Sequence, residues 1–299
     1  MAPKRRKGSS SRDNFKKQKS TTSESDHLSD IDFLSNSASR FLQRDIDSLR
    51  VKFQGASGKF SVIPRNAGQY VLPQITPNIL SDGNFDVDSL GITNCSVLTF
   101  INKLHKVVLN AAVAIGTAKT TDSLVDDLLR IVELNEWPTW IENHPLLRLF
   151  IEGQPRVSAD PEFVVNKRST TNACRIDAHM IILEDKHIRN VRPETGFGEV
   201  QIAAEMLAYG SENIGAARAV IDQIIFGVRV ISTYVTFYKA EIRGGYWTEL
   251  SNGLPTQHSV VIKRWPPTNN DQSGLNLADP AGRRAVLESL IGIREFILQ

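Results

Sequence analysis

Two short stretches of the chain hold side chains that could do chemistry together. One is ADPEF, with Asp160 and Glu162 two positions apart, and the other is IILEDK, which ends in Glu184, Asp185 and Lys186. Side chains alternate faces along a β-strand, so Asp160 and Glu162 should share one face. By the same rule Glu184 and Lys186 form a pair, and Asp185 points away from them.

These residue types suit one reaction, the metal-assisted hydrolysis of a phosphodiester. Clustered carboxylates repel one another unless a cation neutralises them. Ligands that offer only oxygen favour Mg²⁺ or Mn²⁺ over zinc. A lysine beside such a metal can stabilise a phosphate or serve the attacking water. The sequence therefore predicts a magnesium or manganese site held by Asp160 or Glu162 together with Glu184, with Lys186 next to it.

Four elements would have to position these side chains. We expect strands at 156–165 and 176–186, paired as a hairpin across a polar turn, because this pairing lets the two acidic stretches converge. The helix expected at 197–213 carries Gln201 and Glu205 one turn apart, able to face the same site. A helix expected at 121–135 carries Asp126 on its polar side.

The order of these motifs resembles the signature of the PD-(D/E)XK nuclease-like superfamily over roughly residues 120–265. The resemblance implies a restriction-endonuclease-like core sheet flanked by helices, with Asp160 or Glu162 as the first acid and Glu184 and Lys186 as the E-x-K element. It implies that Asp160 and Glu184 hold the metal, that Gln201 assists catalysis, and that Glu205 and Asp126 support the site. Asp122 and Glu133 are the alternatives to Asp126.

Three points remain open: whether the domain hydrolyses its ligand, which acid is the partner of Glu184, and whether the charge pair has a function. The chain also looks like uncharacterised fungal proteins and the C-terminal domains of Crinkler-type effectors, so a nuclease-like module without turnover could bind nucleic acid or a protein partner. The partner of Glu184 could be Asp177 instead of Asp160 or Glu162, although seven residues of strand would separate them by roughly 23 Å. The charge pair could also be only the solvated end of a strand.

The chain divides into three parts by composition. Residues 1–40 are Ser-, Lys- and Arg-rich and predict a disordered arm. Residues 41–94 predict an irregular connector with a short helix between 31 and 53, because Gly, Pro and Asn dominate 54–92. Residues 95–299 predict a mixed α/β domain with further helices at 96–118 and from Pro280, capped by Asp279, and strands at 223–242 and 258–265.

The charge of the chain is concentrated in the first 20 residues. Eight bases and one acid give this arm a charge of +7, so the remaining body carries −5 in a chain of net charge +2. The clusters that hold Lys4, Arg5, Arg6, Lys7, Lys16, Lys17 and Lys19 predict nuclear import through a receptor, or an electrostatic grip on phosphates, with the cytoplasm as the alternative location.

Neither a disulfide framework nor a membrane span is expected. Two cysteines, Cys95 and Cys174, are too few for a disulfide-stapled scaffold, and the longest nearly apolar run is too short and interrupted to cross a bilayer. The sequence does not indicate an oligomeric state.

Overall fold

The computed structural model of the chain describes residues 30–65, 72–113, 118–168, 176–183, 193–270 and 272–299. Within these ranges the α-helices are α1 (Gln43–Ser48), α2 (Pro77–Leu80), α3 (Cys95–Val113), α4 (Ala118–Ile131), α5 (Glu199–Ala217), α6 (Gly244–Leu250) and α7 (Pro280–Leu298). The strands are β1 (Val51–Gly55), β2 (Thr139–Asn143), β3 (Leu147–Ile151), β4 (Gln154–Ala159), β5 (Phe163–Arg168), β6 (Ile176–Leu183), β7 (Gln223–Ile231), β8 (Tyr234–Ile242), β9 (Val260–Trp265) and β10 (Leu275–Asn276). Short 3₁₀ turns are η1 (Asp30–Phe33), η2 (Ala38–Arg40), η3 (Lys59–Ser61), η4 (Val87–Leu90) and η5 (Pro193–Gly198). The predicted mixed α/β class is confirmed.

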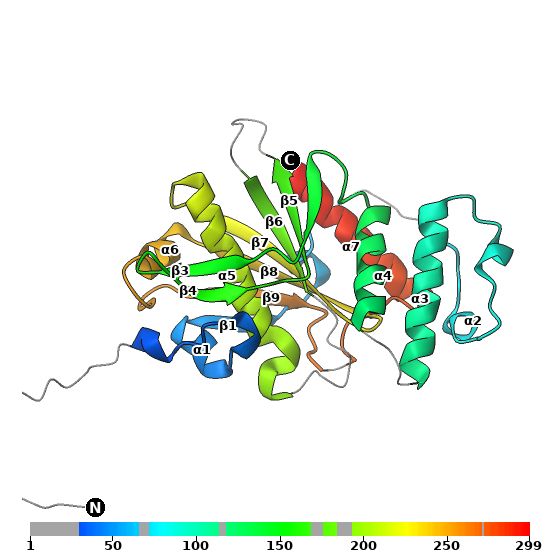
Figure 1. The fold of residues 1–299 in the computed structure, drawn as a ribbon, viewed down its shortest axis with the longest axis horizontal. Coiled ribbons are helices and arrows are strands. Elements are labelled where there is room, and N and C mark those ends of the chain that lie inside the picture. The colour runs from blue at the N-terminus through cyan, green and yellow to red at the C-terminus, as the bar shows by residue number, and fades with distance from the viewer. Residues whose placement is uncertain (1–29, 66–71, 114–117, 169–175, 184–192, 271) are drawn as a thin grey trace, which may run out of the picture.

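One mixed sheet organises the fold. Its order is β1-β9-β8-β7-β6-β5-β2, with β10 added to β8, while β3 and β4 form a separate pair (Figure 1). The β5–β6 and β7–β8 pairs are antiparallel, and α5 carries the chain from β6 to its parallel neighbour β7. The carboxyl ends of β6 and β7 therefore lie at the same end of the sheet as the amino ends of β5 and β8.

Two apolar cores pack against the two faces of the sheet. One core joins α3, α4 and α7 to Phe163 and Val165 of β5 and to Phe237 of β8. The other joins α5, α1, α6 and the β3–β4 pair to Val164 of β5 and Tyr238 of β8. Figure 1 shows α5 crossing the sheet, with α3, α4 and α7 gathered at one side of the molecule. Because side chains alternate along a strand, successive residues of β5 and β8 point alternately into one core and the other.

Several predicted elements are confirmed where the local signals were strong. The segment 223–242 forms two strands joined by a tight turn, and β9 lies within the predicted 258–265. Helix α7 begins at Pro280, and the Asp279 side chain accepts a hydrogen bond from the Gly282 N–H at 2.8 Å, the N-cap that the sequence indicated. Helices α3, α4 and α5 fall within a few residues of the predicted ranges.

Other predictions about the elements are wrong. The stretch 156–165 is not one strand: β4 ends at Ala159 and β5 begins at Phe163, because Pro161 offers no N–H for a ladder. The predicted helix between 31 and 53 is confined to α1 and two 3₁₀ turns.

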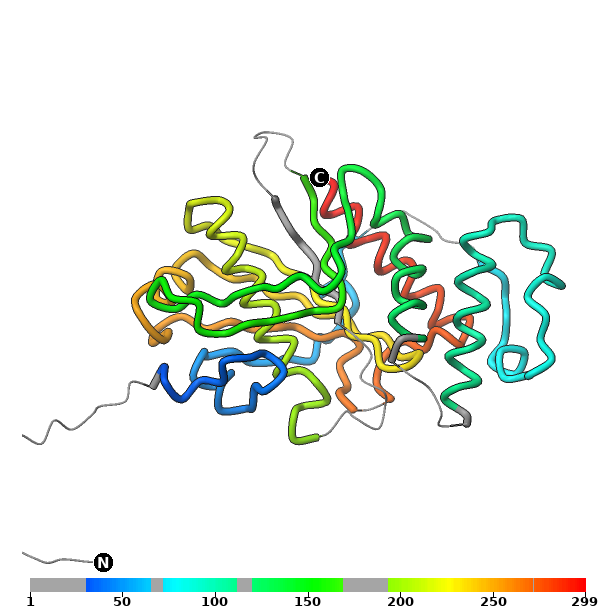
Figure 2. The backbone as a smooth tube through the Cα atoms, viewed as in Figure 1, coloured from blue at the N-terminus to red at the C-terminus, as the bar shows by residue number. Residues whose placement is uncertain are grey.

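The segment assigned to a connector contributes β1, which pairs in parallel with β9 and so belongs to the main sheet (Figure 2). Strands β2 and β3 and helix α6 were missed.

Helix α5 approaches its neighbours closely at Gly210. A Cβ atom there would lie 2.6 Å from Cζ2 of Trp247 and 2.9 Å from Cδ1 of Ile225. We expect Gly210→Ala to lower the free energy of unfolding by about 1–3 kcal/mol through overpacking, although alanine favours helix. Gly215→Ala on the same helix is the control, since nothing lies within 4 Å of its Cβ position. Urea unfolding should show no loss for Gly215→Ala, and equal changes in both variants would contradict the close contact.

Candidate functional site

The first acidic stretch lies at the corner between the small β3–β4 pair and the main sheet. Here Glu162 directly precedes β5, and its carbonyl oxygen accepts a hydrogen bond from the His144 N–H at 3.0 Å. This bond extends the ladder between β2 and β5 by one step beyond the pair Asn143–Phe163. Glu162 itself lies in a bend immediately before the first residue of β5.

The two acids of the corner differ in exposure. The side chain of Asp160 is 66% exposed, and its Oδ1 lies 4.0 Å from Nδ1 of His144. Glu162 is only 9% exposed. The expectation that both share a strand face is wrong, because both precede the first residue of β5. Of the two, the buried Glu162 is the one positioned inside the fold.

The register between β5 and β6 brings the end of β6 to this corner. Phe163 pairs with Ile182 and Val164 with Ile181, so the beginning of β5 lies beside the end of β6. The predicted antiparallel pairing is confirmed for β5 and β6. Glu184, Asp185 and Lys186 follow β6 directly in sequence and lie outside the described residues. Asp177 lies within β6 and pairs with Lys167, at the opposite end of the hairpin from Phe163.

Helix α5 carries two further predicted residues. Nε2 of Gln201 donates a hydrogen bond to Oε1 of Glu205 at 2.7 Å, as their spacing of one turn permits. Glu205 is completely buried, so this part of α5 is not the wet face of an ordinary helix. A buried carboxylate requires donors or a cation around it. Glu205 is thus buried on α5, and Glu162 is buried where β5 begins.

Asp126 is on the other side of the sheet. It belongs to α4, whose apolar residues join the core with α3 and α7. Its Oδ2 accepts a hydrogen bond from Nε of Arg130 at 3.0 Å. Because α5 packs on the opposite face, the structure does not bring Asp126 together with Glu162, Gln201 or Glu205.

Sequence reasoning missed a buried charged cluster beside the corner. Arg229, 3% exposed, pairs in register with Leu183 at the end of β6. Its Nη1 donates to the Phe197 carbonyl at 2.6 Å and to Oδ1 of Asn269 at 3.0 Å. The lone arginine in the apolar run QIIFGVRVI was the signal that could have identified it. Through these two hydrogen bonds Arg229 connects η5, which precedes α5, to the loop after β9.

The second part of this cluster is an ion pair at the start of α5. Nη1 of Arg264 on β9 donates to Oε1 of Glu199 at 2.6 Å, and both side chains are almost fully buried. Burial raises the pKa of Glu199, while the hydrogen bond and charge of Arg264 oppose that rise. Burial also raises the pKa of the neighbouring Tyr238 hydroxyl, which therefore stays protonated at neutral pH. The pair fixes the first turn of α5 against β9.

The described residues contain no group of three or more histidine, cysteine, aspartate or glutamate side chains arranged to hold a metal ion. The donors they do offer at the corner are carboxylate and amide oxygens, the chemistry that Mg²⁺ takes. A metal there would therefore need Glu162 together with an acid from the stretch that follows β6.

Comparisons with known proteins add no relative. No protein-family model matches the chain, and no curated protein is similar to it. In the part of the chain that the structure describes, none of the helices has the length and apolar character needed to cross a bilayer. The basic residues of the arm, Lys4 to Lys19, lie outside the described residues.

Proposed function

We propose that the corner where β5 begins and β6 ends carries a metal-dependent phosphodiesterase site acting on nucleic acid. The observation that supports it is the burial of Glu162 beside the end of β6, together with the hydrogen-bonded pair of Gln201 and Glu205 on α5. Together with E-x-K at 184–186, these residues supply the oxygen ligands and the cation that the chemistry requires.

Each residue has a role in this proposal. Glu162, in place of the exposed Asp160, holds Mg²⁺ or Mn²⁺ with an acid from the stretch after β6, taken as Glu184. When bound, the metal supplies Lewis-acid activation of the phosphate and of the attacking water. Lys186 stabilises the charge that develops on the phosphate. The Gln201 side chain, fixed by Glu205, orients the carboxylates.

The test compares the two acids of the corner. Purified full-length chain should cleave plasmid DNA or single-stranded RNA with Mg²⁺ and stop on addition of chelator. Glu162→Gln should reduce cleavage by about 10²-fold or more, because it removes a negative ligand with little change in shape. Asp160→Asn changes the exposed acid two residues before Glu162 and should retain most activity. Circular dichroism should show that both variants fold.

Further variants identify which acid after β6 holds the metal with Glu162, and one variant removes a carboxylate far from the proposed site as a control. Because the described register ends at Leu183, Glu184→Gln and Asp185→Asn are made separately, alongside Lys186→Ala. Asp126→Asn, on the opposite face of the sheet, should leave cleavage unchanged. Undiminished cleavage by Glu162→Gln would overturn the assignment. Metal-independent binding without any cleavage would favour a non-hydrolytic binding module.

A further inference from the structure

A second feature lies on the opposite face of the sheet, where the helical layer stops. Val235 and Phe237 of β8 are buried in the core under α3, α4 and α7. Further along the same face, Lys239 is partly exposed and Glu241 is exposed. The helices therefore leave the last part of β8 uncovered, and the neighbouring part of β9 with it.

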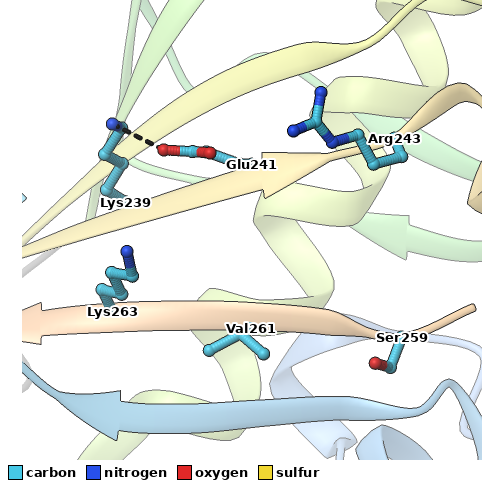
Figure 3. A pocket seen from close by; sticks show the side chains of 6 residues that line it. All are labelled: Lys239, Glu241, Arg243, Ser259, Val261 and Lys263. Carbon is cyan, nitrogen blue, oxygen red and sulfur yellow. Dashed lines mark ion pairs between the residues drawn. The ribbon is translucent and has the colours of Figure 1, made fainter.

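An open hollow of about 210 Å³ occupies this uncovered area. It is lined by Lys239, Glu241, Arg243, Ser259, Val261 and Lys263 (Figure 3). Figure 3 shows Lys263 rising from β9 toward β8, and the Arg243 side chain leaning along β8 toward Glu241. Val261, 39% exposed, forms an apolar part of the floor. The hollow lies at the opposite end of β8 from Thr236, which pairs with Arg229 beside the candidate catalytic corner.

The strand register places two lysines directly opposite each other. Lys239 pairs with Lys263 in the antiparallel ladder between β8 and β9. Directly opposed side chains of such a ladder have Cβ atoms about 5 Å apart, and like charges there destabilise the sheet. On the far side of β9, Lys52 of β1 is exposed and pairs with Val261, so it joins the same face. The fold thus holds three ammonium groups on adjacent strands.

The acids nearby do not balance these cations. Lys239 forms an ion pair with Glu241 at 2.8 Å, and Arg243 pairs with Asp222 at 2.7 Å. Among the described residues, neither Lys52 nor Lys263 has an ion-pair partner. The hydrogen bond from Lys239 lowers the pKa of Glu241, and the charges of Lys263 and Arg243 lower it further. Lys239, Lys263 and Arg243 are therefore all close enough to influence the same carboxylate. The four cations Lys52, Lys239, Lys263 and Arg243 outnumber the two acids Glu241 and Asp222, which leaves the area with a net charge of +2 to attract an anion.

We propose that this hollow binds a phosphoryl group between Lys239 and Lys263, with Arg243 at its side. A phosphate between the two ammonium groups removes their mutual repulsion and gains charge-assisted hydrogen bonds. Val261 lies two positions from Lys263 along β9 and Ser259 four positions, so both line the part of the hollow into which a sugar carried by the phosphate would extend. The phosphoryl group comes either from a free phosphate or nucleotide, or from a nucleic-acid backbone. The inference does not depend on hydrolysis at the β5–β6 corner.

The test uses the full-length chain and three probes: inorganic phosphate, adenosine monophosphate and a fluorescent single-stranded oligonucleotide. Lys263→Gln should weaken binding of the recognised probe about tenfold, and Lys239→Gln/Lys263→Gln more. Lys106→Gln, an exposed lysine on α3, is the matched control and should bind within about twofold of the unchanged chain. The measurements are made with chelator and without Mg²⁺, which separates this site from the metal-dependent site proposed at the β5–β6 corner.

The probes distinguish the source of the phosphoryl group. If phosphate and the nucleotide bind and Lys263→Gln loses both, the ligand is a small phosphate compound. If only the oligonucleotide binds, Lys263→Gln should also lower the slope of log affinity against log salt by about one. Either result supports the site. Equal binding by Lys263→Gln and Lys106→Gln with every probe, or no binding of any probe, would overturn it.

Thermal unfolding separates binding from a structural role of the lysines. Without ligand, Lys263→Gln should melt at the same temperature as the unchanged chain or higher, because it removes a like-charge pair. The rise in melting temperature that a bound probe gives the unchanged chain should be absent in the variant. A lower melting temperature of Lys263→Gln without ligand would instead make Lys263 a structural residue and contradict the proposal.

Discussion

Arg264→Met is expected to lower the free energy of unfolding by about 3–5 kcal/mol, because it leaves Glu199 buried without its ion-pair partner. The two side chains are 13% and 7% exposed, so water cannot replace the lost guanidinium. Arg264 also donates from Nη2 to the Pro267 carbonyl at 2.6 Å, and this carbonyl would lose its donor. Methionine keeps much of the apolar volume, which limits the effect of a cavity.

The loss should depend on pH with a definite sign. The folded chain holds Glu199 at a raised pKa, and an unfolded glutamate has an ordinary pKa near 4.5. Between these two pKa values the folded state binds the extra proton, so stability is highest below the ordinary pKa and falls as pH rises through the folded one. Removal of Arg264 raises the folded pKa further. The difference between Arg264→Met and the unchanged chain should therefore be larger at neutral pH than near pH 4.5.

Urea unfolding at several pH values measures this difference. Arg130→Met breaks the exposed pair with Asp126 on α4 and should cost only about 0.5 kcal/mol. Glu199→Gln/Arg264→Met should be more stable than the sum of the two single changes implies, since no charge is then left buried alone. A loss no larger than that of Arg130→Met, or one that does not vary with pH, would show that the pair contributes little.

Arg283→Met is the second change expected to have a large effect, about 3–5 kcal/mol. Arg283 on α7 is 1% exposed, and its guanidinium donates to four backbone carbonyls, those of Leu277, Ala278, Pro73 and Ile75, at 2.8–3.3 Å. Each buried carbonyl left without its donor costs about 1–3 kcal/mol. Lysine cannot repair the site, because a single ammonium group does not span the four positions.

The neighbouring arginine is the control for this prediction. Arg284→Met changes an exposed side chain of the same helix and should shift the free energy of unfolding by less than about 0.5 kcal/mol. Hydrogen exchange adds a local readout, because Arg283 connects α7 to the segment before α2. Arg283→Met should speed exchange in residues 75–90 more than in β7. Uniform acceleration over the whole chain would instead show that Arg283 has only a global effect on stability.

The sequence predicted those parts of the fold that depend on short-range residue preferences and on the periodicity of apolar residues. The β-branched run 223–242, the Asp279–Pro280 cap and the apolar side of α4 each follow from short-range preference and periodicity, and each is found. β1 escaped prediction because its partner β9 lies far away in sequence, and its five residues are too short a run to stand out beside the Gly- and Pro-rich text that follows. β2 and β3 are short and lie among Pro and His residues that indicated only a break.

The candidate site was predictable in part for the same reason. The hairpin between β5 and β6 and the pair Gln201–Glu205 follow from strand and helix periods. The choice between Asp160 and Glu162 depended on where β4 ends, and so on the corner that Pro161 makes. Arg229 stands alone in an apolar run, which was the available signal, whereas Arg264 and Arg283 are buried against partners that include distant segments and no sequence period indicates their burial.

The parallel pairing of β1 with β9 sets an order of events during synthesis. Val51 lies beside Val260, so the edge of the sheet cannot be completed until residue 260 has left the ribosome. At ~5–20 residues per second, the N-terminal strand waits about 10–40 s for its partner. From the time β8 has been made until β9 follows it, β8 is an open edge with unpaired backbone groups. Nascent chains should therefore need protection from aggregation until translation passes β9.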